Sequence, residues 1–320
     1  MNMLISTAST DPWYNLALEE LLFDTHRSGV LLYLWQNSNT VVIGRHQNAW
    51  KECRIAELEN DGGRLARRTS GGGAVFHDLG NLNFTFITKR DEYDLPRQLS
   101  VITAAAGKLG INTHFTGRND IVTDSGAKFS GNAFRFSASV GMHHGTILIN
   151  SDMDKLARYL RPSAQKLAAK GVESVRSRVV NLASISPITV DDMRLAITST
   201  FADEYGDFTV LYETALSASR LTELRERHAS FEWRCARTPD FDMELSHRFD
   251  WGEVLLQLCC QNGLISKATV YSDAMDVSFI SRISPALTGC QISGAEMAQA
   301  MLPLGGESED IALWLRYCGL

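Results

Sequence analysis

The chain has 320 residues, 44% of them apolar and 21% charged, and a net charge of −6. This composition is typical of a globular protein with two domains, or with one large domain and an appendage, and it excludes collagen, coiled coil and general disorder. Because the chain is acidic, we do not expect it to bind nucleic acid. It lacks an apolar run of the ~18 residues that a membrane span needs, and it begins without a secretory signal, so we expect a cytoplasmic protein that does not bind membranes.

Helical and strand patterns alternate irregularly through the first third of the chain. Asp11 and Pro12 are typical of a helix start, because Asp accepts hydrogen bonds from free N–H groups and Pro suits the first turn. In chain order, the patterns predict a helix from Asp11, strands over residues 31–35 and 40–43, a helix over 50–59, strands over 65–69 and 83–88, and a helix over 99–109.

The rest of the chain continues this mixture. Residues 121–123 and 128–130 predict a hairpin, residues 146–149 a strand, and residues 153–160 and 190–205 helices. Short strands, hairpins and intervening helices favour the α+β class with a mixed sheet over a doubly wound parallel sheet.

A domain boundary is predicted after the turn signal Thr238-Pro239. We place the domains at residues 1–243 and 244–320, the second being a small module packed on the first. From Gly252 onward the chain has 3 Lys or Arg against 7 Asp or Glu, so the small module is the more acidic part.

The densest candidate for chemistry is the glycine triplet Gly71 to Gly73, which follows Arg67 and Arg68 and precedes His77-Asp78. Three glycines let a ligand approach the backbone, and their N–H groups can converge on an anion. The arginines add positive charge, so the segment suits a phosphate or a carboxylate. The alternative is an ordinary glycine-rich turn with solvated arginines. The spacing matches neither a P-loop nor a dinucleotide fingerprint.

Two further segments carry charge that suits an anion. Asp120 could hold Mg²⁺, and Lys128, a short hairpin away, could lie on a carboxylate or a transferring phosphoryl group. The alternative for Lys128 is a solvated charge on a strand edge. Residues 169–178 combine Lys and Arg with Gly and Ser, which is typical of a loop that closes over an anion, although an ordinary solvated loop fits as well.

Cysteine and histidine patterns indicate no metal centre. The six cysteines form no C-x-x-C pair, so reduced thiols are expected. No cysteine lies between Cys53 and Cys235, so chemistry in that stretch cannot use a thiolate. His143 and His144 have no third ligand at suitable spacing, which favours a hydrogen-bonding role. Trp35 and Phe76 fit either a pocket wall or the core.

The sequence resembles the lipoate–protein ligase A family. The specific motif is Arg-Arg-x-Ser-Gly-Gly-Gly-Ala-Val-Phe-His-Asp over residues 67–78. Further matching stretches cover most of residues 11–181 in order, and the tail from Trp251 is similar to the family's accessory domain. They are residues 11–17, 40–45, 50–53, 117–120, 143–146 and 170–181.

The resemblance implies a biotin/lipoate ligase-like catalytic domain with a mixed sheet, followed by a small C-terminal α+β domain. It also implies a two-step reaction. Lipoate and Mg·ATP give lipoyl-AMP and pyrophosphate. A lysine of a lipoyl domain then takes the lipoyl group and releases AMP.

The resemblance also implies roles for individual residues. Lys128 is expected to be catalytic, because its charge would steady the lipoate carboxylate and the α-phosphate. ATP is expected to contact Arg68, Gly73, Ala74, Val75, Phe76, Asn119, Asp120, Lys128 and Arg178. Lipoate is expected to contact Trp35, Ser70, Gly71, Gly72, His77 and Lys128. Asp120 is the candidate Mg²⁺ ligand, and residues 171–181 resemble the segment that closes on the adenylate.

The expected partners are lipoyl domains of 2-oxoacid dehydrogenase complexes and the glycine cleavage H protein. Because such domains are commonly acidic in the family picture, we expect them to dock near the arginine-bearing loops of residues 1–251. Two alternatives remain open: an ATP-independent lipoyl or octanoyl transferase of the same fold, and a non-catalytic lipoate-binding protein. A preference for lipoate over octanoate does not follow from the sequence.

Overall fold

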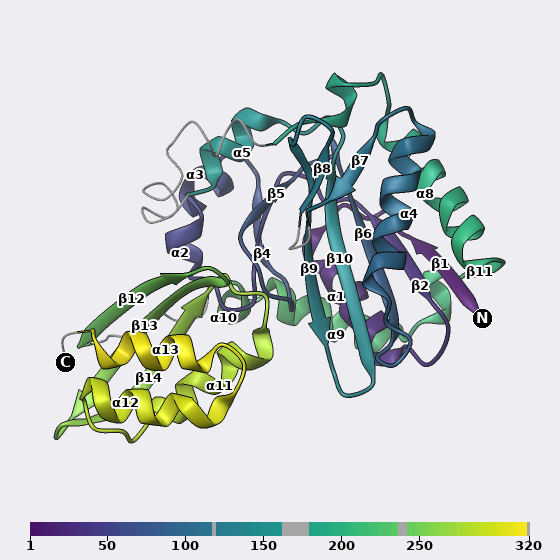
Figure 1. Ribbon diagram of the computed structural model, residues 1–320. Helices are drawn as coiled ribbons and strands as arrows, with labels where there is room; N and C mark the ends of the chain where they lie inside the picture. The colour runs from purple at the N-terminus through teal and green to yellow at the C-terminus, as the bar shows by residue number, and fades with distance from the viewer. Residues whose placement is uncertain (117–119, 162–178, 236–241, 319–320) are drawn as a thin grey trace.

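The computed structural model describes residues 1–116, 120–161, 179–235 and 242–318. It has the predicted α+β architecture, with a large unit built on a mixed sheet and a small C-terminal α+β unit beside it (Figure 1). Across the described segments, every helix is too short or too polar for a bilayer span. The division at residues 243 and 244 stays a prediction.

The large unit contains the elements that build most of the cavity described below. Its strands are β1 (Asn2–Ser6), β2 (Leu31–Trp35), β3 (Thr40–Ile43), β4 (Arg64–Arg67), β5 (Val75–His77), β6 (Asn81–Lys89), β7 (Thr113–Phe115), β8 (Asp120–Thr123), β9 (Lys128–Phe136), β10 (Val140–Leu148) and β11 (Phe208–Val210). Its helices are α1 (Pro12–Thr25), α2 (Ala49–Glu52), α3 (Ile55–Asn60), α4 (Leu95–Lys108), α5 (Met153–Tyr159), α8 (Val190–Tyr205), α9 (Ala218–Ala229) and α10 (Phe231–Cys235).

An eight-stranded sheet forms the centre of the large unit, in the order β11-β1-β2-β6-β10-β9-β8-β7. Strands β11, β1 and β2 pair in parallel, and the other pairs are antiparallel. Helices α4 and α8 pack on one face, and α1 and α9 lie on the other (Figure 1). Burial of both faces explains why β2 and β6 are almost continuously apolar or buried.

A second, three-stranded sheet of the order β4-β3-β5 lies beside the larger one. Its apolar side chains pack with those of α2, α3 and α5, and the cluster includes Cys53 and Cys235. The sheet carries the glycine triplet in the connection between β4 and β5. It therefore holds this loop against the face of the eight-stranded sheet on which α1 also packs.

The C-terminal unit is an antiparallel sheet covered by three helices. Its strands are β12 (Met243–Phe249), β13 (Gly252–Gln261) and β14 (Leu264–Ser272), and its helices are α11 (Val277–Leu287), α12 (Gly294–Met301) and α13 (Ser308–Arg316). The helices bury an apolar cluster against one face of the sheet. The unit therefore has its own hydrophobic core.

The predicted helix over residues 50–59 is wrong. The chain instead forms two short helices, α2 and α3, separated at Cys53. Cys53 makes a β-bridge with Leu160, and the Arg54 N–H donates to the carbonyl oxygen of Tyr159. These tertiary hydrogen bonds replace the helical ones. The start at Asp11 is confirmed, since its side chain accepts a hydrogen bond from the Trp13 N–H.

A buried carboxylate joins the two helices on the α1 face and makes stability depend on pH. Glu20 accepts hydrogen bonds from His228 Nε2, at 2.9 Å, and from Arg227. Burial opposes ionisation, but these hydrogen bonds and charges lower the pKa of Glu20 from 4.5 to about 2. Because the folded pKa lies below the ordinary value, the stabilisation is complete above about pH 4.5 and is lost as pH falls toward 2.

We therefore expect the free energy of unfolding to fall as the pH is lowered from 4.5 to 2. The fall should be larger in the wild type than in Glu20→Gln, by roughly 2–3 kcal/mol. Urea unfolding at a series of pH values measures this difference. Equal pH slopes for the two proteins would contradict the assignment.

Candidate active site

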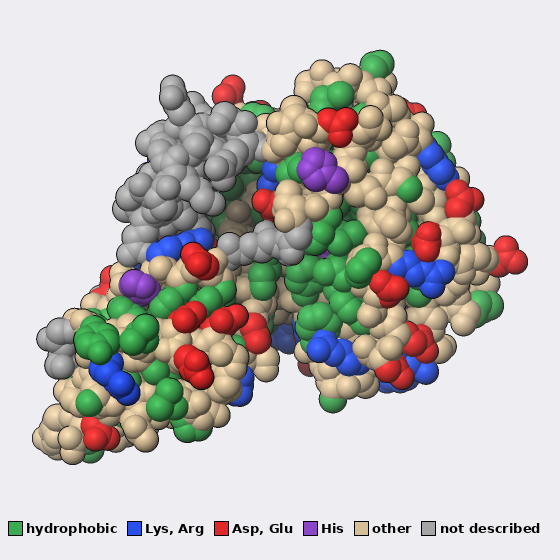
Figure 2. All heavy atoms as spheres, in the orientation of Figure 1, with side chains coloured by type: hydrophobic (Ala, Val, Ile, Leu, Met, Phe, Trp, Pro, Cys, Tyr) green, Lys and Arg blue, Asp and Glu red, His purple; other side chains and the backbone are tan. Residues whose placement is uncertain are grey.

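A cavity of about 330 Å³ lies between the eight-stranded sheet, the glycine loop and the C-terminal unit. Figure 2 shows the hollow between the two units, with hydrophobic side chains on the side of the large unit. The C-terminal unit contributes Arg248, Trp251, Gly252, Asp273 and Met275 to the lining. Residues distant in sequence therefore meet at one concave site, as expected of a small-molecule pocket.

One wall of the cavity is a row of residues that crosses five strands of the sheet. Trp35 on β2 pairs with Asn83 on β6, and Asn83 pairs with Thr146 on β10. The Thr146 hydroxyl accepts a hydrogen bond from the Gly131 N–H on β9, and Gly131 pairs with Asp120 on β8. Paired residues point to the same face of a sheet, so this row forms a continuous surface.

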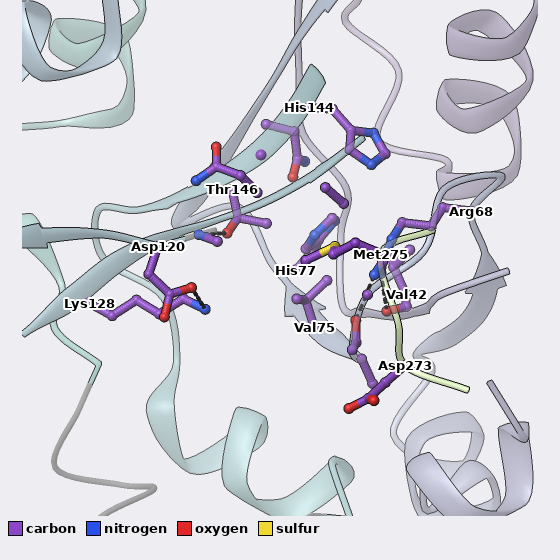
Figure 3. Close-up of a pocket in the computed structure, with 18 of the residues that line it drawn as sticks. Val42, Arg68, Val75, His77, Asp120, Lys128, His144, Thr146, Asp273 and Met275 are labelled. Atoms are coloured by element: carbon purple, nitrogen blue, oxygen red, sulfur yellow. Dashed lines mark hydrogen bonds and ion pairs between the residues drawn. The ribbon is translucent and has the colours of Figure 1, made fainter. Parts of the chain in front are cut away.

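Lys128 lies at one end of this row (Figure 3). Its Nζ is 2.7 Å from Oδ1 of Asp120, and its side chain is one-third exposed. A Cβ on Gly131 would lie 3.0 Å from that nitrogen, so glycine leaves the room that the ammonium occupies. The Val180 N–H donates to the Lys128 carbonyl oxygen, which ties the end of the predicted closing segment to this residue.

The two arginines before the glycine triplet are buried, with their donors directed at main-chain carbonyl groups. Arg68 donates to Ser70 Oγ and to the carbonyl oxygens of Val42, Gly71 and Gly73. Burial lowers the pKa of Arg68 to about 10, although the charge of Glu19 opposes the shift. Arg67 donates to five carbonyl oxygens, and its guanidinium is also buried. Arg68 therefore shapes the glycine loop and also lines the cavity, whereas Arg67 holds the segment of residues 44–47 against helix α10.

A chain of buried hydrogen bonds connects helix α1 with the glycine loop. Glu19 Oε1 lies 2.7 Å from His144 Nδ1, and His144 Nε2 lies 2.6 Å from Ser70 Oγ. Glu19 also accepts from the Thr85 hydroxyl. Burial would raise the pKa of Glu19, but His144 and Thr85 outweigh it and lower the value. The hydrogen-bonding role predicted for His144 is confirmed, as is that of His143, which contacts Gln98 and Asn132.

The C-terminal unit touches the glycine loop directly. The Gly72 N–H donates to the carbonyl oxygen of Ala274, at 3.1 Å. A Cβ on Gly71 would lie only 2.3 Å from that same oxygen, so a side chain at this position would separate the two segments. Gly72 has a φ of +86°, a conformation that favours glycine. The triplet thus permits both a tight turn and a close contact between the two units.

The cavity brings together most of the residues predicted from the sequence. Those that line it are Trp35, Arg68, Gly72, Gly73, Ala74, Val75, His77, Asp120 and Lys128. Ser70 and Gly71 lie behind the lining, in contact with His144 and Ala274 respectively. The Phe76 ring packs against Tyr159 in the core of the small sheet. Asn119 and Arg178 lie outside the described residues.

Several residues of the site were not predicted from the sequence. Glu19 had a signal, because it is a carboxylate within the apolar run of α1. Asn83 and Thr146 are unremarkable polar residues on strands, and only the register places them in the cavity. The contributions of Arg248, Asp273 and Met275 depend on how the two units pack, for which the sequence offers no local signal.

Comparison with known proteins identifies similar families and folds. The family model described as the lipoyl protein ligase A/B catalytic domain matches residues 11–202, and the model of the bacterial lipoate protein ligase C-terminus matches residues 238–308. The crystal structure of P. falciparum LipL1 in complex with lipoate is 25% identical over 99% of both chains, with a TM-score of 0.88.

Two further solved structures share the fold over a smaller part of this chain. A bipartite lipoate protein ligase of Thermoplasma acidophilum, studied with its E2 lipoyl domain, is 26% identical and covers 76% of this chain and 98% of its own, with a TM-score of 0.65. A lipoate-protein ligase A bound with ATP is 24% identical over 73% of this chain and 97% of its own, with a TM-score of 0.62.

Proposed function

Because the chain belongs to the lipoyl protein ligase A/B family, we propose that it is an ATP-dependent lipoate–protein ligase. In the first step, a carboxylate oxygen of lipoate attacks the α-phosphorus of ATP, and pyrophosphate leaves. In the second step, the amine of a lysine on a lipoyl domain attacks the acyl carbonyl, loses a proton and releases AMP. The product is a lipoyl amide.

The observation that carries this proposal is the position of Lys128 in the cavity. Joining a carboxylate to a phosphate brings two anions together, so the site must supply positive charge where negative charge builds. Lys128 Nζ provides it at the end of the row that leads to Trp35. The ion pair with Asp120 holds the ammonium in place before substrates arrive.

The remaining site residues have proposed roles on either side of this lysine. ATP would contact Arg68, the backbone of residues 73–76, Asp120 and the more distant Asn119 and Arg178. Lipoate would lie against Trp35, His77 and the loop of Ser70, Gly71 and Gly72. Residues 171–181 would close over the adenylate and exclude water, which otherwise hydrolyses the anhydride.

Asp120 fits the magnesium ion that accompanies the nucleotide. Mg²⁺ at such sites is held by one or two carboxylates together with substrate phosphates and water. Asp120 supplies one carboxylate at the cavity, and no cluster of three metal-ligating side chains occurs among the described residues. When bound, the ion would neutralise phosphate charge. Asp120 would hold it there, while Lys128 is released toward the carboxylate.

The cavity supports ATP-dependent ligation over a transferase that uses a cysteine acyl-enzyme. The lining formed by the described residues contains no cysteine. Cys53 and Cys235 are buried in the core of the small sheet, and burial raises the pKa of the Cys53 thiol to about 12. A thiol of this kind is almost entirely protonated near neutral pH and is therefore a poor nucleophile.

Incubation with lipoate, Mg·ATP and an unmodified lipoyl domain tests the function. Ligation releases pyrophosphate and adds the mass of one lipoyl group to the domain. A transferase would instead modify the domain from an acylated carrier without ATP, and a binding protein would do neither. The proposed acceptors are lipoyl domains of 2-oxoacid dehydrogenases and the H protein, in the cytoplasm, where ATP is available.

Lipoyl transfer is expected to slow severalfold between low and moderate salt, whereas lipoyl-AMP formation changes less. The reason is that two arginines, Arg45 and Arg135, lie beside the glycine loop. The Arg45 N–H donates to the Ser70 carbonyl oxygen, and Arg135 donates to the Thr69 hydroxyl. An acidic carrier domain would be attracted to this surface. Transfer rates measured across a series of NaCl concentrations check this, and a salt-independent rate would count against electrostatic docking.

A further inference from the structure

Two polar side chains in the cavity carry N–H groups without a partner among the described residues. They are Asn83, which is 2% exposed, and His77, which is 3% exposed. The free atoms are Asn83 Nδ2 and His77 Nε2. An unpaired buried donor is costly, so its presence at a cavity wall indicates an acceptor on the ligand.

The hydrogen-bond network defines which atoms donate. Asn15 Nδ2 donates to Asn37 Oδ1, so Asn37 presents Nδ2 to His77 Nδ1, at 3.1 Å. His77 Nδ1 is therefore an acceptor, and the proton lies on Nε2. Burial, with added repulsion from Arg68 and His144, lowers the pKa of His77 to about 3, so the ring is neutral at pH 7. Asn83 Oδ1 accepts from Asn81, which leaves Nδ2 to donate.

Both donors lie beside Trp35, in the apolar part of the cavity. Asn83 pairs with Trp35 across the sheet, and the His77 ring meets the Trp35 ring edge to face, with centroids 6.0 Å apart. Leu16 and Val42 belong to the same apolar cluster as Trp35 and also line the cavity. No anionic side chain is paired with either donor, so the pair suits a neutral group with weak acceptors.

The distance from Lys128 places this pair at the far end of a bound acyl chain. Lys128 Nζ lies beside Gly131 on β9, and Asn83 lies in the same row on β6, two strands away. At the usual strand spacing this separation is about 10 Å. If Lys128 holds the carboxylate of an extended medium-length acid, the tail of that acid reaches the space between Asn83, His77 and Trp35.

We infer that Asn83 and His77 form a neutral donor pair that selects an acid with a cyclic disulfide at its far end over a plain hydrocarbon acid of the same length. Sulfur atoms accept weak hydrogen bonds and pack well against aromatic rings. A hydrocarbon tail would displace water from the pair and leave both donors unpaired. This inference rests on the proposed function, and it assigns to that function a preference for lipoate over octanoate.

The ratio of kcat/KM for lipoate to that for octanoate, measured as pyrophosphate release from Mg·ATP, tests the inference. The wild type is expected to favour lipoate, and Asn83→Leu to lower the ratio roughly tenfold. His77→Phe removes the other donor and is also expected to lower this ratio. It is the variant to measure if Asn83→Leu does not fold. Because both acids are compared on one protein, a general loss of stability cancels from the ratio.

Val42→Ala is the matched control, since it enlarges the apolar wall without removing a donor and should weaken both acids alike. A wild type that uses both acids equally, or donor variants with an unchanged ratio, would overturn the inference while leaving ligation intact. If no pyrophosphate is released with either acid, calorimetric binding of the two acids to the same proteins decides. Tighter binding of lipoate that depends on Asn83 would then support selection by the donor pair, although the ligase proposal would fail. Equal affinities for the two acids would overturn selection by the donor pair.

Discussion

Lys128→Ala is expected to form lipoyl-AMP about 10²- to 10³-fold more slowly than the wild type, which is the scale for removing one preorganised electrostatic contact from a transition state. The ammonium lies in a cavity partly shielded from water, where its charge acts more strongly than at the surface. Removing it leaves the carboxylate and phosphate to repel each other. It also leaves Asp120 as an additional negative charge at the same point.

Single-turnover formation of lipoyl-AMP measures this effect directly, with circular dichroism to show that the variant is folded. Lys108→Ala is the matched control, because Lys108 also forms a 2.7 Å ion pair, with Asp203, but lies on the exposed side of α4. Its adenylation rate should equal that of the wild type. An undiminished rate in Lys128→Ala would remove Lys128 from the proposed mechanism.

Lys128→Arg separates charge from shape. The Gly131 backbone approaches the lysine Nζ so closely that even a Cβ there would lie 3.0 Å away. A planar guanidinium is wider than an ammonium and presents its donors in a fixed fork. We therefore expect Lys128→Arg to recover only part of the lost rate, despite its full charge.

The sequence predicted the members of the site more accurately than it predicted the contacts between them. The resemblance placed Lys128 and Asp120 in one site, but it assigned Asp120 to ATP and magnesium and did not predict its ion pair with Lys128. The ion pair depends on how β8 pairs with β9: Asp120 lies opposite Gly131, and a register shift between Ile121 and Val122 places Val122 opposite Lys128. A bulge of this kind follows from packing across the whole sheet, and local patterns do not specify it.

The arginines show a second limit of sequence reasoning. Two adjacent arginines before a glycine triplet predict guanidinium groups that can bind an anion. This prediction assumes that both side chains are exposed. Whether a guanidinium faces a ligand or main-chain carbonyl groups is decided by burial, which the fold sets. Helix prediction over residues 50–59 failed for a related reason, since the hydrogen bond from Arg54 to the Tyr159 carbonyl joins segments about a hundred positions apart.

Arg68→Lys is expected to lower the free energy of unfolding by about 2–4 kcal/mol and to raise the KM for both lipoate and ATP. Arg68 satisfies Ser70 Oγ and three carbonyl groups with the planar geometry of one guanidinium. A lysine ammonium is a compact donor that cannot reach all of them at once. At least one carbonyl group in the loop would then be buried without a hydrogen bond.

Urea unfolding and substrate-dependence curves on the same protein test this prediction. Arg97→Lys is the control, because Arg97 pairs with Glu204 at the surface, where the expected loss is below about 1 kcal/mol. Loss of stability with unchanged KM values would mean that Arg68 only supports the fold. Unchanged stability would mean that the loop holds its conformation without the guanidinium. Loss of both together would show that one buried side chain stabilises the loop and shapes the substrate site, because two of the carbonyl groups it holds, those of Val42 and Gly73, belong to residues that line the cavity.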